Sequence, residues 1–288
     1  MAKIISGNRI VPVWLEALEH LEVNHRRFRN LVLEIESPVT VTKTDRAVIG
    51  LVDPVLRARC GTNVVTVAGT IFPWGLYKKT PAATLPKRFL EIMGKAQEPG
   101  SWGTYAMRLM SRPGKKPGET INPLYEVVRK LKKASTDGVG YNSNYELGVH
   151  APEDLLSEDI ACEVPLYNPA EDRTMISKYP CLSHLTFKLI ERKTIELTAI
   201  YRSHYYLERA LGNLIGLTHL MRFVVKETGL EAGRLTCIST DAHLDVESWG
   251  GVAKTRPVLE QLKAAAADEA PAAPSAPKFQ MSDTCAAA

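Results

Sequence analysis

Hydrophobic and polar positions follow two different periods along this chain, and each period predicts one type of element. Residues 12–22 (PVWLEALEHLE) place apolar residues at helical spacing, with a proline in the first turn, and predict a helix. Residues 27–37 (RFRNLVLEIES) alternate between apolar and polar and predict a strand that ends at Pro38. Two further alternating runs, 183–190 and 194–202, are separated by the residues ERK and predict a β-hairpin.

The C-terminal half contains the longest apolar helical pattern. Residues 206–228 (YLERALGNLIGLTHLMRFVVKET) predict a long buried helix, and Gly229 stands where a helix end favours glycine. Residues 121–134 predict an amphipathic helix whose basic residues lie toward its C-terminal end, where the helix dipole favours them. Residues 234–245 (RLTCISTDAHLD) alternate again and predict a strand.

The remaining segments have weaker patterns. Residues 65–77 are apolar but predict neither a helix nor a strand clearly. Residues 78–120 are rich in proline, glycine and lysine, with SRPGKKPGET predicted as an exposed loop, and residues 135–180 predict loops and short strands. We expect one folded domain over 1–262 and a disordered Ala/Pro-rich tail over 263–288, because that tail lacks bulky apolar residues.

Composition is that of an ordinary folded protein. Of the 288 residues, 45% are hydrophobic and 24% are charged. No run approaches the roughly 18 apolar residues that can span a bilayer. The first residues, MAKIISGNRIVPVW, lack the apolar core of a secretory signal, so we expect a cytoplasmic protein without a membrane partner. The net charge of +4 suits small anionic ligands but falls short of the basic stripe of a nucleic-acid binder, so no nucleic-acid partner is expected.

The cysteines are predicted to be free thiols rather than cross-links. There are five, widely spaced and odd in number, and none forms a CxxC pair. This pattern predicts reduced thiols and neither a disulfide framework nor a zinc site. Cys181, in YPCLSH, directly follows a proline and precedes the predicted hairpin. An isolated cysteine is usually a small buried hydrophobic residue, whereas a nucleophile needs a nearby cation to ionise it.

Three short motifs follow Cys181 in a fixed order. They are YRS at 201–203, LGN at 211–213 and DAH at 241–243. With Cys181 they resemble the thymidylate synthase superfamily, in which a Pro-Cys nucleophile opens a strand and an Arg-Ser pair ends the partner strand. In that family an Asn follows on the long buried helix and an Asp-x-His lies beyond it. TGLEAGRL is similar to the family's GL-x-x-G turn, and the resemblance covers roughly 121–245 well and the preceding residues loosely.

The resemblance implies a fold and an activity. The fold would be α+β: a large, mixed and bent β-sheet with helices on one side, in a single domain. The other face of the sheet would form a homodimer interface. The activity would be addition of a methyl or hydroxymethyl group to C5 of a pyrimidine nucleoside monophosphate, with 5,10-methylenetetrahydrofolate as the carbon donor.

The resemblance also gives roles to the residues around the predicted nucleophile. Cys181 would add to C6 as a thiolate and so raise the electron density at C5. Arg202 would lower the pKa of this thiol and, with Ser203, bind the phosphate; taken alone, Arg202 is equally consistent with a surface arginine at a strand end. Asn213 would pair with O4 and N3–H of uracil, and its alternative is a buried asparagine satisfied by the backbone.

Further candidates lie farther away in the sequence. Tyr105, in WGTYAMR, resembles the family's active-site tyrosine and would move a proton from C5. Asp241 and His243 would lie near the sugar and the water of the site. Arg26 or Arg27, in NHRRFRN, would take the place of a flexible phosphate-binding arginine, or would be basic loop residues at a helix end.

Two departures from the family concern the phosphate and the nucleophile. The family donates two adjacent arginines from a partner subunit, but the corresponding segment 158–164 (EDIACEV) has none. Either Arg173 or Lys178 substitutes for them, or the phosphate is held more weakly, or the role of the partner has changed. Leu182 replaces the histidine that usually follows the nucleophile.

Three more departures concern the other ligand contacts. Tyr201 and Tyr205 stand where the family has a glutamine and the aspartate that contacts the folate pterin, so they are the candidate cofactor-binding residues. Asp245 replaces the tyrosine that contacts the sugar. A carboxylate there would accept hydrogen bonds from both hydroxyls of a ribose, which favours a ribonucleotide.

Asn213 favours uracil as the base. Within the superfamily, the alternative is a CMP or dCMP 5-hydroxymethylase of nucleoside-antibiotic or modified-DNA metabolism. The alternative from another class is a homologue that binds nucleotide without catalysis, and the last is an unrelated α/β enzyme.

Overall fold

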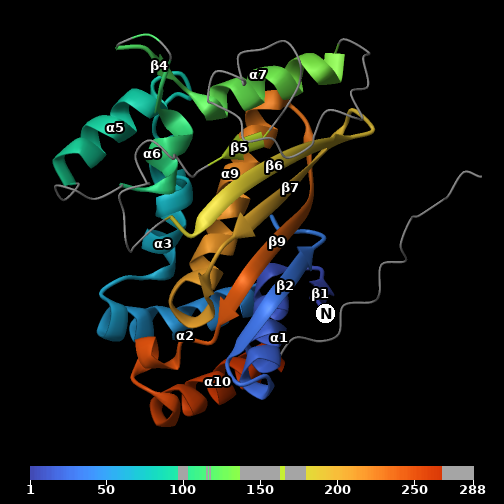
Figure 1. Cartoon of the computed structure of the whole chain (residues 1–288), viewed down its shortest axis with the longest axis vertical. Helices are drawn as coiled ribbons and strands as arrows, with labels where there is room; N and C mark the ends of the chain where they lie inside the picture. Colours follow the sequence, from blue (N-terminus) through green and yellow to red (C-terminus); the bar gives the residue numbers. More distant parts are fainter. Residues whose placement is uncertain (97–102, 115, 117, 137–162, 166–179, 268–288) are drawn as a thin grey trace, which may run out of the picture.

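A mixed β-sheet forms the centre of the molecule (Figure 1). The computed structural model describes residues 1–96, 103–114, 116, 118–136, 163–165 and 180–267. Within these residues the sheet has seven strands in the order β1-β2-β9-β7-β6-β5, with β8 paired to β9. The strands are β1 Lys3–Gly7, β2 Arg27–Ile35, β5 Glu163–Pro165, β6 Leu182–Ile190, β7 Thr194–Tyr201, β8 His204–Tyr205 and β9 Glu231–His243.

The strand directions make this sheet mixed. β1 pairs with β2, and β7 and β8 pair with β9, in parallel. The pairs β2–β9, β6–β7 and β5–β6 are antiparallel. A separate ribbon joins β3 Arg112–Pro113 to β4 Thr120–Ile121. Buried residues alternate with partly exposed ones along β7, because successive side chains point to opposite faces, so one face of the sheet is the core face.

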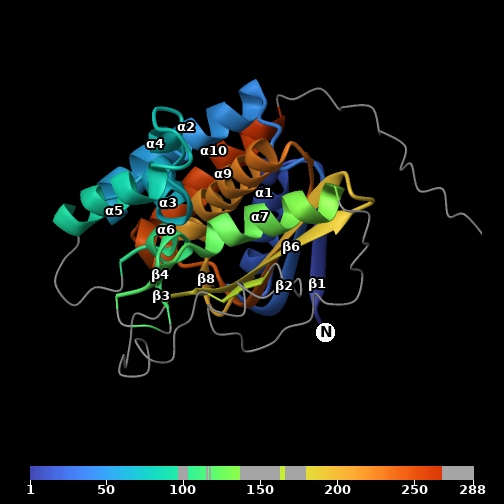
Figure 2. The same ribbon diagram turned by 90° about the horizontal axis from the view of Figure 1, so that it is seen from above.

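Helices gather on one side of the sheet, as Figure 2 shows. The helices are α1 Ile10–Val23, α2 Lys43–Cys60, α3 Val64–Ile71, α4 Trp74–Tyr77, α5 Leu85–Ala96, α6 Tyr105–Met110, α7 Pro123–Thr136, α9 Leu211–Thr228 and α10 Val252–Ala267. A π-helical turn, Tyr206–Ala210, leads into α9, and a 3₁₀ turn, Val246–Trp249, precedes α10. α1 packs on β2, and α9 packs on β7 and β9. Every helix in the described residues is too short or too polar to span a bilayer.

The strongly periodic segments fold as predicted. The helix expected at 12–22 is α1, the strand expected at 27–37 is β2, and the hairpin is β6–β7. The long helix is confirmed from Leu211, but its first turn is π-helical. It ends at Gly229 in the left-handed region, with φ of 78°. The mixed α+β architecture with flanking helices is therefore confirmed.

The weakly patterned segments contain helices that were not predicted. Residues 65–77 hold most of α3 and all of α4, and 78–120 hold α5 and α6. These helices are short, and local caps begin some of them, such as the Asn63 side chain that accepts the Thr66 N–H at the start of α3. α2, which has no predicted counterpart, begins with a capping box formed by Thr42 and its third helical residue.

The predicted tail begins inside a helix. α10 continues through Ala267, so residues 263–267 are helical, and 268–288 lie outside the described residues. Most of the segment expected to hold loops and short strands, 137–162 and 166–179, also lies outside them.

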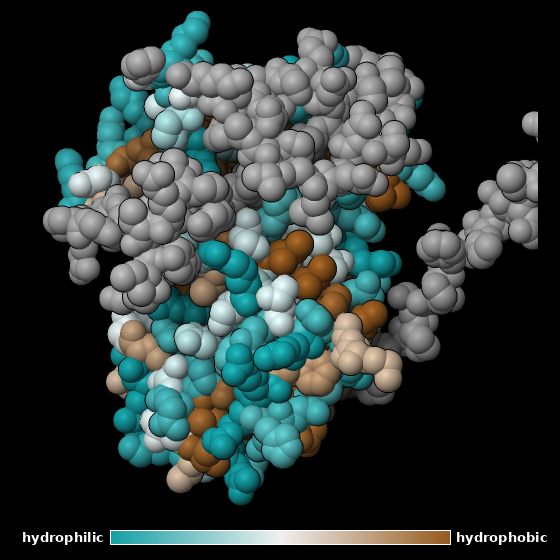
Figure 3. All heavy atoms as spheres, in the orientation of Figure 1, coloured by the Kyte–Doolittle hydropathy of each residue, from teal (hydrophilic) through white to brown (hydrophobic). Residues whose placement is uncertain are grey.

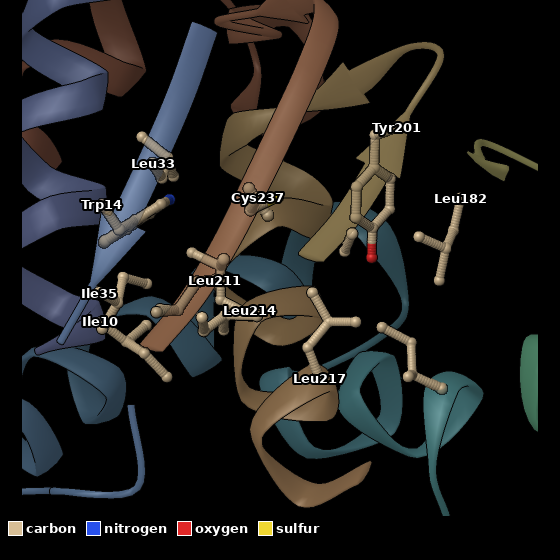
Figure 4. Packing of buried hydrophobic residues seen from close by; sticks show 14 of the residues in the cluster. Ile10, Trp14, Leu33, Ile35, Leu182, Tyr201, Leu211, Leu214, Leu217 and Cys237 are labelled. Atoms are coloured by element: carbon tan, nitrogen blue, oxygen red, sulfur yellow. The ribbon is translucent and has the colours of Figure 1, made fainter. Parts of the chain in front are cut away.

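The hydrophobic core fills the space between the sheet and its helices (Figure 4). Trp14 of α1, Leu33 of β2 and Cys237 of β9 are fully buried there. The Trp14 indole Nε1 donates to the carbonyl of Tyr206 at 2.9 Å. This hydrogen bond joins α1 to the π-helical turn. The segment that leads into α9 is therefore fixed to the hydrophobic core.

α9 packs closely on α3 through two glycines. A Cβ at Gly212 would lie 2.5 Å from Cβ of Val67, and one at Gly216 would lie 2.7 Å from the Ala68 carbonyl oxygen. Both distances are shorter than atoms can approach, so the helices meet at this spacing only with glycine. The contact also fixes the position of Asn213, which follows Gly212 on α9, relative to α3.

Gly216→Ala is expected to lower the free energy of unfolding by about 1–3 kcal/mol, because the new methyl group overlaps backbone atoms that cannot rotate away. Gly50→Ala in α2 is the control. Apart from its chain neighbours and the backbone of its own helix, no atom of the described residues lies within 4 Å of a Cβ there, and alanine is favoured over glycine in a helix by about 1 kcal/mol. Chemical denaturation measures both. Wild-type stability of Gly216→Ala would contradict the close contact.

Candidate active site

A cavity of about 430 Å³ lies where α3, α6, the start of β6 and the π-helical turn meet. Five predicted site residues line it: Tyr105, Cys181, Ser203, Tyr205 and Asn213. Within the described residues its lining is completed by Thr70, Gly103, His204, Glu208 and Arg209. Side chains that are far apart in the sequence therefore share one enclosed volume.

Cys181 directly precedes β6, and its half-buried thiol lines the cavity. Its carbonyl accepts the backbone N–H of Arg202 at 2.9 Å, so the hairpin returns the chain to the cysteine. Burial raises the pKa of the Cys181 thiol, whereas the positive charges of Arg202 and Arg209 lower it. The net shift is upward, so in this state the thiol is protonated at neutral pH.

Arg202 lies beside Cys181 rather than in the lining of the cavity. Its guanidinium donates to the carbonyl of Pro180, the residue before Cys181. The charge is thereby held at the start of β6, where it favours a thiolate. Ser203 follows it and reaches the cavity.

Tyr105 holds the backbone of the cysteine. It begins α6, and its buried hydroxyl accepts the N–H groups of Cys181 at 3.0 Å and Leu182 at 3.2 Å. Burial raises the pKa of Tyr105 to about 12. The phenol is therefore protonated at neutral pH. Its oxygen is hydrogen-bonded to the backbone of the residue that carries the thiol.

Asn213 presents its amide to the cavity from the first turn of α9. The side chain is buried, and its Nδ2 lies 3.1 Å from Nε2 of His204. The partner of Asn213 is thus a side chain, and the predicted alternative of an amide satisfied by the backbone is not what the structure shows.

Sequence reasoning did not identify His204, Glu208 or Arg209. Glu208 and Arg209 lie on the π-helical turn, and their side chains pair at 2.6 Å beside the cavity. In the sequence, the signal that could have identified Glu208 and Arg209 was a pair of adjacent charged residues inside an otherwise apolar helical pattern. His204 gave no signal, because only the fold shows that it is buried behind the cavity.

Asp241, His243 and Arg27 form a cluster between β2 and β9, outside the lining of the cavity. Asp241 accepts two hydrogen bonds from Arg27, at 2.8 and 2.7 Å, and its Oδ2 lies 3.1 Å from Nε2 of His243. The hydrogen bonds from Arg27 lower the pKa of Asp241. The His243 ring meets Tyr205 edge-on with centroids 5.5 Å apart, which joins the cluster to the cavity.

Asp245 and Arg26 have other surroundings than expected. The Asp245 carboxylate accepts the backbone N–H of Leu207 at 2.8 Å and of Glu208 at 3.2 Å, so it caps the π-helical turn. Burial raises the pKa of Asp245. Arg26 lines a different cavity, of about 240 Å³, together with Glu22. Neither side chain lines the cavity that contains Cys181.

Tyr201 lies on the core face of β7 (Figure 4). Its ring is fully buried and stacks on His204 with centroids 4.0 Å apart. A bound cofactor cannot reach this ring without opening the core, so the structure gives Tyr201 a packing role instead of the expected cofactor contact. Arg173, Lys178 and residues 158–162 lie outside the described residues.

Tyr201→Phe is expected to raise the free energy of unfolding by about 1 kcal/mol, because an unpaired buried hydroxyl costs about 1–3 kcal/mol. The Tyr201 hydroxyl has no hydrogen-bond partner among the described residues. Thermal unfolding should show a midpoint raised by about 2–4 °C. A lower midpoint would show that this hydroxyl has a partner that stabilises the fold.

Within the described residues, no group of three or more His, Cys, Asp or Glu side chains is placed to hold a metal ion. The described lining offers the cavity a thiol, one guanidinium, two phenols, two aliphatic hydroxyls, an imidazole, a carboxylate and an amide, and the guanidinium of Arg202 lies next to it, bonded to the carbonyl of Pro180.

Comparison with known proteins gives relatives with one shared name. No protein-family model matches the chain. A protein of Methanococcoides burtonii named "Putative thymidylate synthase" is 33% identical over 81 residues, 28% of this chain and 37% of that protein. One of the same name from Methanosarcina mazei is 33% identical over 76 residues, 26% of this chain and 35% of that protein. One from Methanothermobacter thermautotrophicus is 23% identical over 248 residues, 85% of this chain and 94% of that protein.

The more similar matches thus span little more than a third of the relatives' length. The match over nearly the whole length has the lower identity. The chain is thus similar to one protein of this name over most of its residues at 23% identity, and to the others over about a quarter of its residues at 33% identity.

Proposed function

We propose that this chain, a divergent thymidylate synthase-like protein, transfers a one-carbon group to C5 of a pyrimidine nucleoside monophosphate, with uracil as the favoured base. The observation that carries the proposal is the cavity that joins the Cys181 thiol, the Tyr105 hydroxyl and the Asn213 amide. Two arginines lie close enough to stabilise the thiolate. The names of the relatives support the same class of reaction.

Cys181 is the proposed nucleophile. Its thiolate forms a bond to C6, and the electrons of the C5–C6 double bond move toward C5 and O4. C5 thereby becomes nucleophilic toward the one-carbon unit that a bound cofactor would supply. Over the whole reaction the C5 proton is lost and the bond between C6 and the Cys181 sulfur breaks again, which restores the C5–C6 double bond and frees the thiolate. Because burial opposes ionisation of the thiol, the positive charges of Arg202 and Arg209 are needed for this step.

Asn213 and Tyr105 are the proposed base-reading and proton-transfer groups. The Asn213 amide accepts N3–H and donates to O4. Tyr105, with a pKa raised to about 12, works as a protonated phenol that relays the C5 proton with a water molecule rather than as a phenolate base.

The phosphate is proposed to bind Ser203 and the two nearby arginines. The backbone of Arg202 is hydrogen-bonded to that of Cys181 across the hairpin, and Arg209 lines the cavity that contains the Cys181 thiol. Arg209 gives the chain a cation of its own where the family's partner arginines are missing from the sequence. Asp241, His243 and Arg27 are the proposed contacts on the sugar side, next to Tyr205. Asp245 is left out, because both its oxygens already accept backbone N–H groups.

The proposed cofactor, 5,10-methylenetetrahydrofolate, supplies the one-carbon unit when it is bound. Tyr205 fits a flat aromatic ligand, because its ring lines the cavity and is 47% exposed. The Glu208 carboxylate lies on the same lining and offers an acceptor for ring N–H groups.

A homodimer through the face of the sheet opposite its helices is part of the proposal. Figure 3 shows this face, where a band of hydrophobic residues crosses between polar regions. An isologous contact between two such faces would cover that band. Sedimentation analysis decides between monomer and dimer.

Release of tritium from 5-tritiated UMP, dUMP, CMP and dCMP tests the proposal. Addition at C6 labilises the C5 hydrogen, so release from a uracil nucleotide is expected in the presence of the cofactor. Faster release from CMP or dCMP would support the cytosine hydroxymethylase instead, and analysis of the product distinguishes methyl from hydroxymethyl. No release from any of the four would overturn the enzymatic proposal.

A nucleotide-binding role without catalysis is the second candidate. The observation that favours it is the raised pKa of the Cys181 thiol, since a protonated thiol does not add to C6. It predicts nucleotide binding without tritium release.

A further inference from the structure

A chain of buried polar groups runs behind Asn213. Nδ2 of Asn213 lies 3.1 Å from Nε2 of His204, and Nδ1 of His204 lies 3.0 Å from Oγ of Ser239. The same Oγ lies 3.1 Å from the hydroxyl of Tyr206. None of the four side chains is more than 5% exposed. Their hydrogen bonds are therefore made with each other and not with solvent.

The hydrogen bonds from Asn213 through His204 to Ser239 all run in one direction, from donor to acceptor. An amide nitrogen can only donate, so Nε2 of His204 is the acceptor in its contact with Asn213. A neutral imidazole carries one proton, which therefore lies on Nδ1 and is donated to Ser239. Burial lowers the pKa of His204 to about 3, so the ring is neutral at ordinary pH. Stacking on Tyr201, with ring planes 4° apart, fixes the plane of the imidazole.

A freely rotating asparagine amide cannot distinguish uracil from cytosine. Uracil presents a donor at N3 and an acceptor at position 4, and cytosine presents the reverse. Rotation of the amide by a half-turn exchanges its oxygen and its nitrogen, so one asparagine can pair with either base. Discrimination between them requires a neighbour that holds the amide in one orientation.

We infer that His204 is the positioning residue that fixes the Asn213 amide and thereby sets the base preference of the cavity. The inference rests on the proposed nucleotide function. Oδ1 of Asn213 has no hydrogen-bond partner among the described residues, so it is the acceptor that the cavity offers to N3–H. The second hydrogen on Nδ2 is offered to O4. In the same pose, cytosine would oppose acceptor to acceptor and donor to donor.

His204→Phe tests this role by calorimetric titration with UMP, dUMP, CMP and dCMP. Phenylalanine keeps a flat ring stacked on Tyr201 and removes both ring nitrogens. The wild type is expected to bind the uracil nucleotide about tenfold or more tightly than the matching cytosine nucleotide. In the variant this ratio is expected to fall to about twofold or less, because the amide rotates freely.

The ratio separates positioning from packing. A merely structural loss would weaken both bases together and leave the ratio unchanged, and that result would overturn the inference. Thr218→Val is the matched control on the same helix. The Thr218 hydroxyl donates to the Leu214 carbonyl at 3.0 Å and does not line the cavity. This variant is expected to lower stability and to keep the wild-type ratio.

A second measurement locates the proton on the imidazole directly. Nitrogen-15 NMR of the imidazole in the nucleotide-free protein is expected to show the proton of His204 on Nδ1. Ser239→Ala removes the acceptor for that proton and is expected to shift it toward Nε2 and to lower the uracil-to-cytosine ratio. A wild-type proton on Nε2 would turn Nδ2 rather than Oδ1 toward N3 and would overturn the orientation of the amide on which the preference for uracil rests.

The two measurements separate the failure of this inference from the failure of the proposed function. If the wild type binds none of the four nucleotides, the proposed function fails, and a proton on Nε2 or Nδ1 still decides whether His204 holds the amide as described. If the wild type prefers cytosine and His204→Phe removes that preference, His204 keeps its positioning role and the assignment of uracil is overturned.

Discussion

Cys181→Ser is expected to reduce release of C5 tritium by a factor on the order of a thousand or more. A serine hydroxyl is almost the size of the thiol, so the cavity keeps its shape. Its pKa is far higher, and the charges of Arg202 and Arg209 that stabilise a thiolate cannot ionise an alcohol at neutral pH. Because the proposal assigns the base and the phosphate to other residues, nucleotide affinity is expected to stay within about threefold of the wild type.

Cys60→Ser is the matched control for this experiment. Cys60 is also a partly buried free thiol, and it donates to the Ser248 carbonyl at 3.3 Å, which a serine hydroxyl can do equally well. This variant is expected to retain tritium release. Wild-type release by Cys181→Ser would show that another group adds to C6. Unchanged affinity with no release in either the wild type or the variant would support the binding protein without catalysis.

The sequence could predict those parts of the site that follow from periodicity and motif order. The alternating runs on both sides of ERK predicted the β6–β7 hairpin, and the hairpin alone places Arg202 against the backbone of Cys181. The order of motifs predicted that Ser203 and Asn213 would join them, and they line the same cavity. The resemblance to the thymidylate synthase superfamily is supported by the relatives named "Putative thymidylate synthase", whereas the roles of these residues stay proposals.

The parts that could not be predicted depend on contacts between distant segments. Asp245 was expected at the sugar, but its partners are the N–H groups of a π-helical turn, and no local pattern distinguishes that turn from the α-helix it enters. His204 stands between two predicted site residues, yet its burial follows from the pairing of β8 with β9. Among the helices that were not predicted, α2, α3 and α6 begin at side-chain caps, and α3 packs on α9, which overrides its weak hydrophobic pattern.

Arg202→Gln is expected to move the pH–rate profile of tritium release to higher pH. In the proposed reaction the active form is the thiolate, and the charge of Arg202 lowers the pKa of Cys181 against the effect of burial. Removing the charge therefore raises that pKa, and each unit of increase reduces the thiolate fraction below the pKa about tenfold. The turnover rate at saturating nucleotide should fall about tenfold or more at pH 7 and recover in part at pH 9.

Arg209→Gln should shift the profile in the same direction by a smaller amount, since Arg202 has the larger effect on the thiol. Arg192→Gln is the control. This arginine stands at the turn of the same hairpin, at the opposite end of β6 from Cys181, and donates to the carbonyls of Ser135 and Thr136. Its removal should therefore leave the profile unchanged. If Arg202→Gln weakens nucleotide binding equally at every pH and does not move the profile, its charge serves the phosphate alone. The thiolate would then depend on Arg209 or on the bound substrate for its stabilisation.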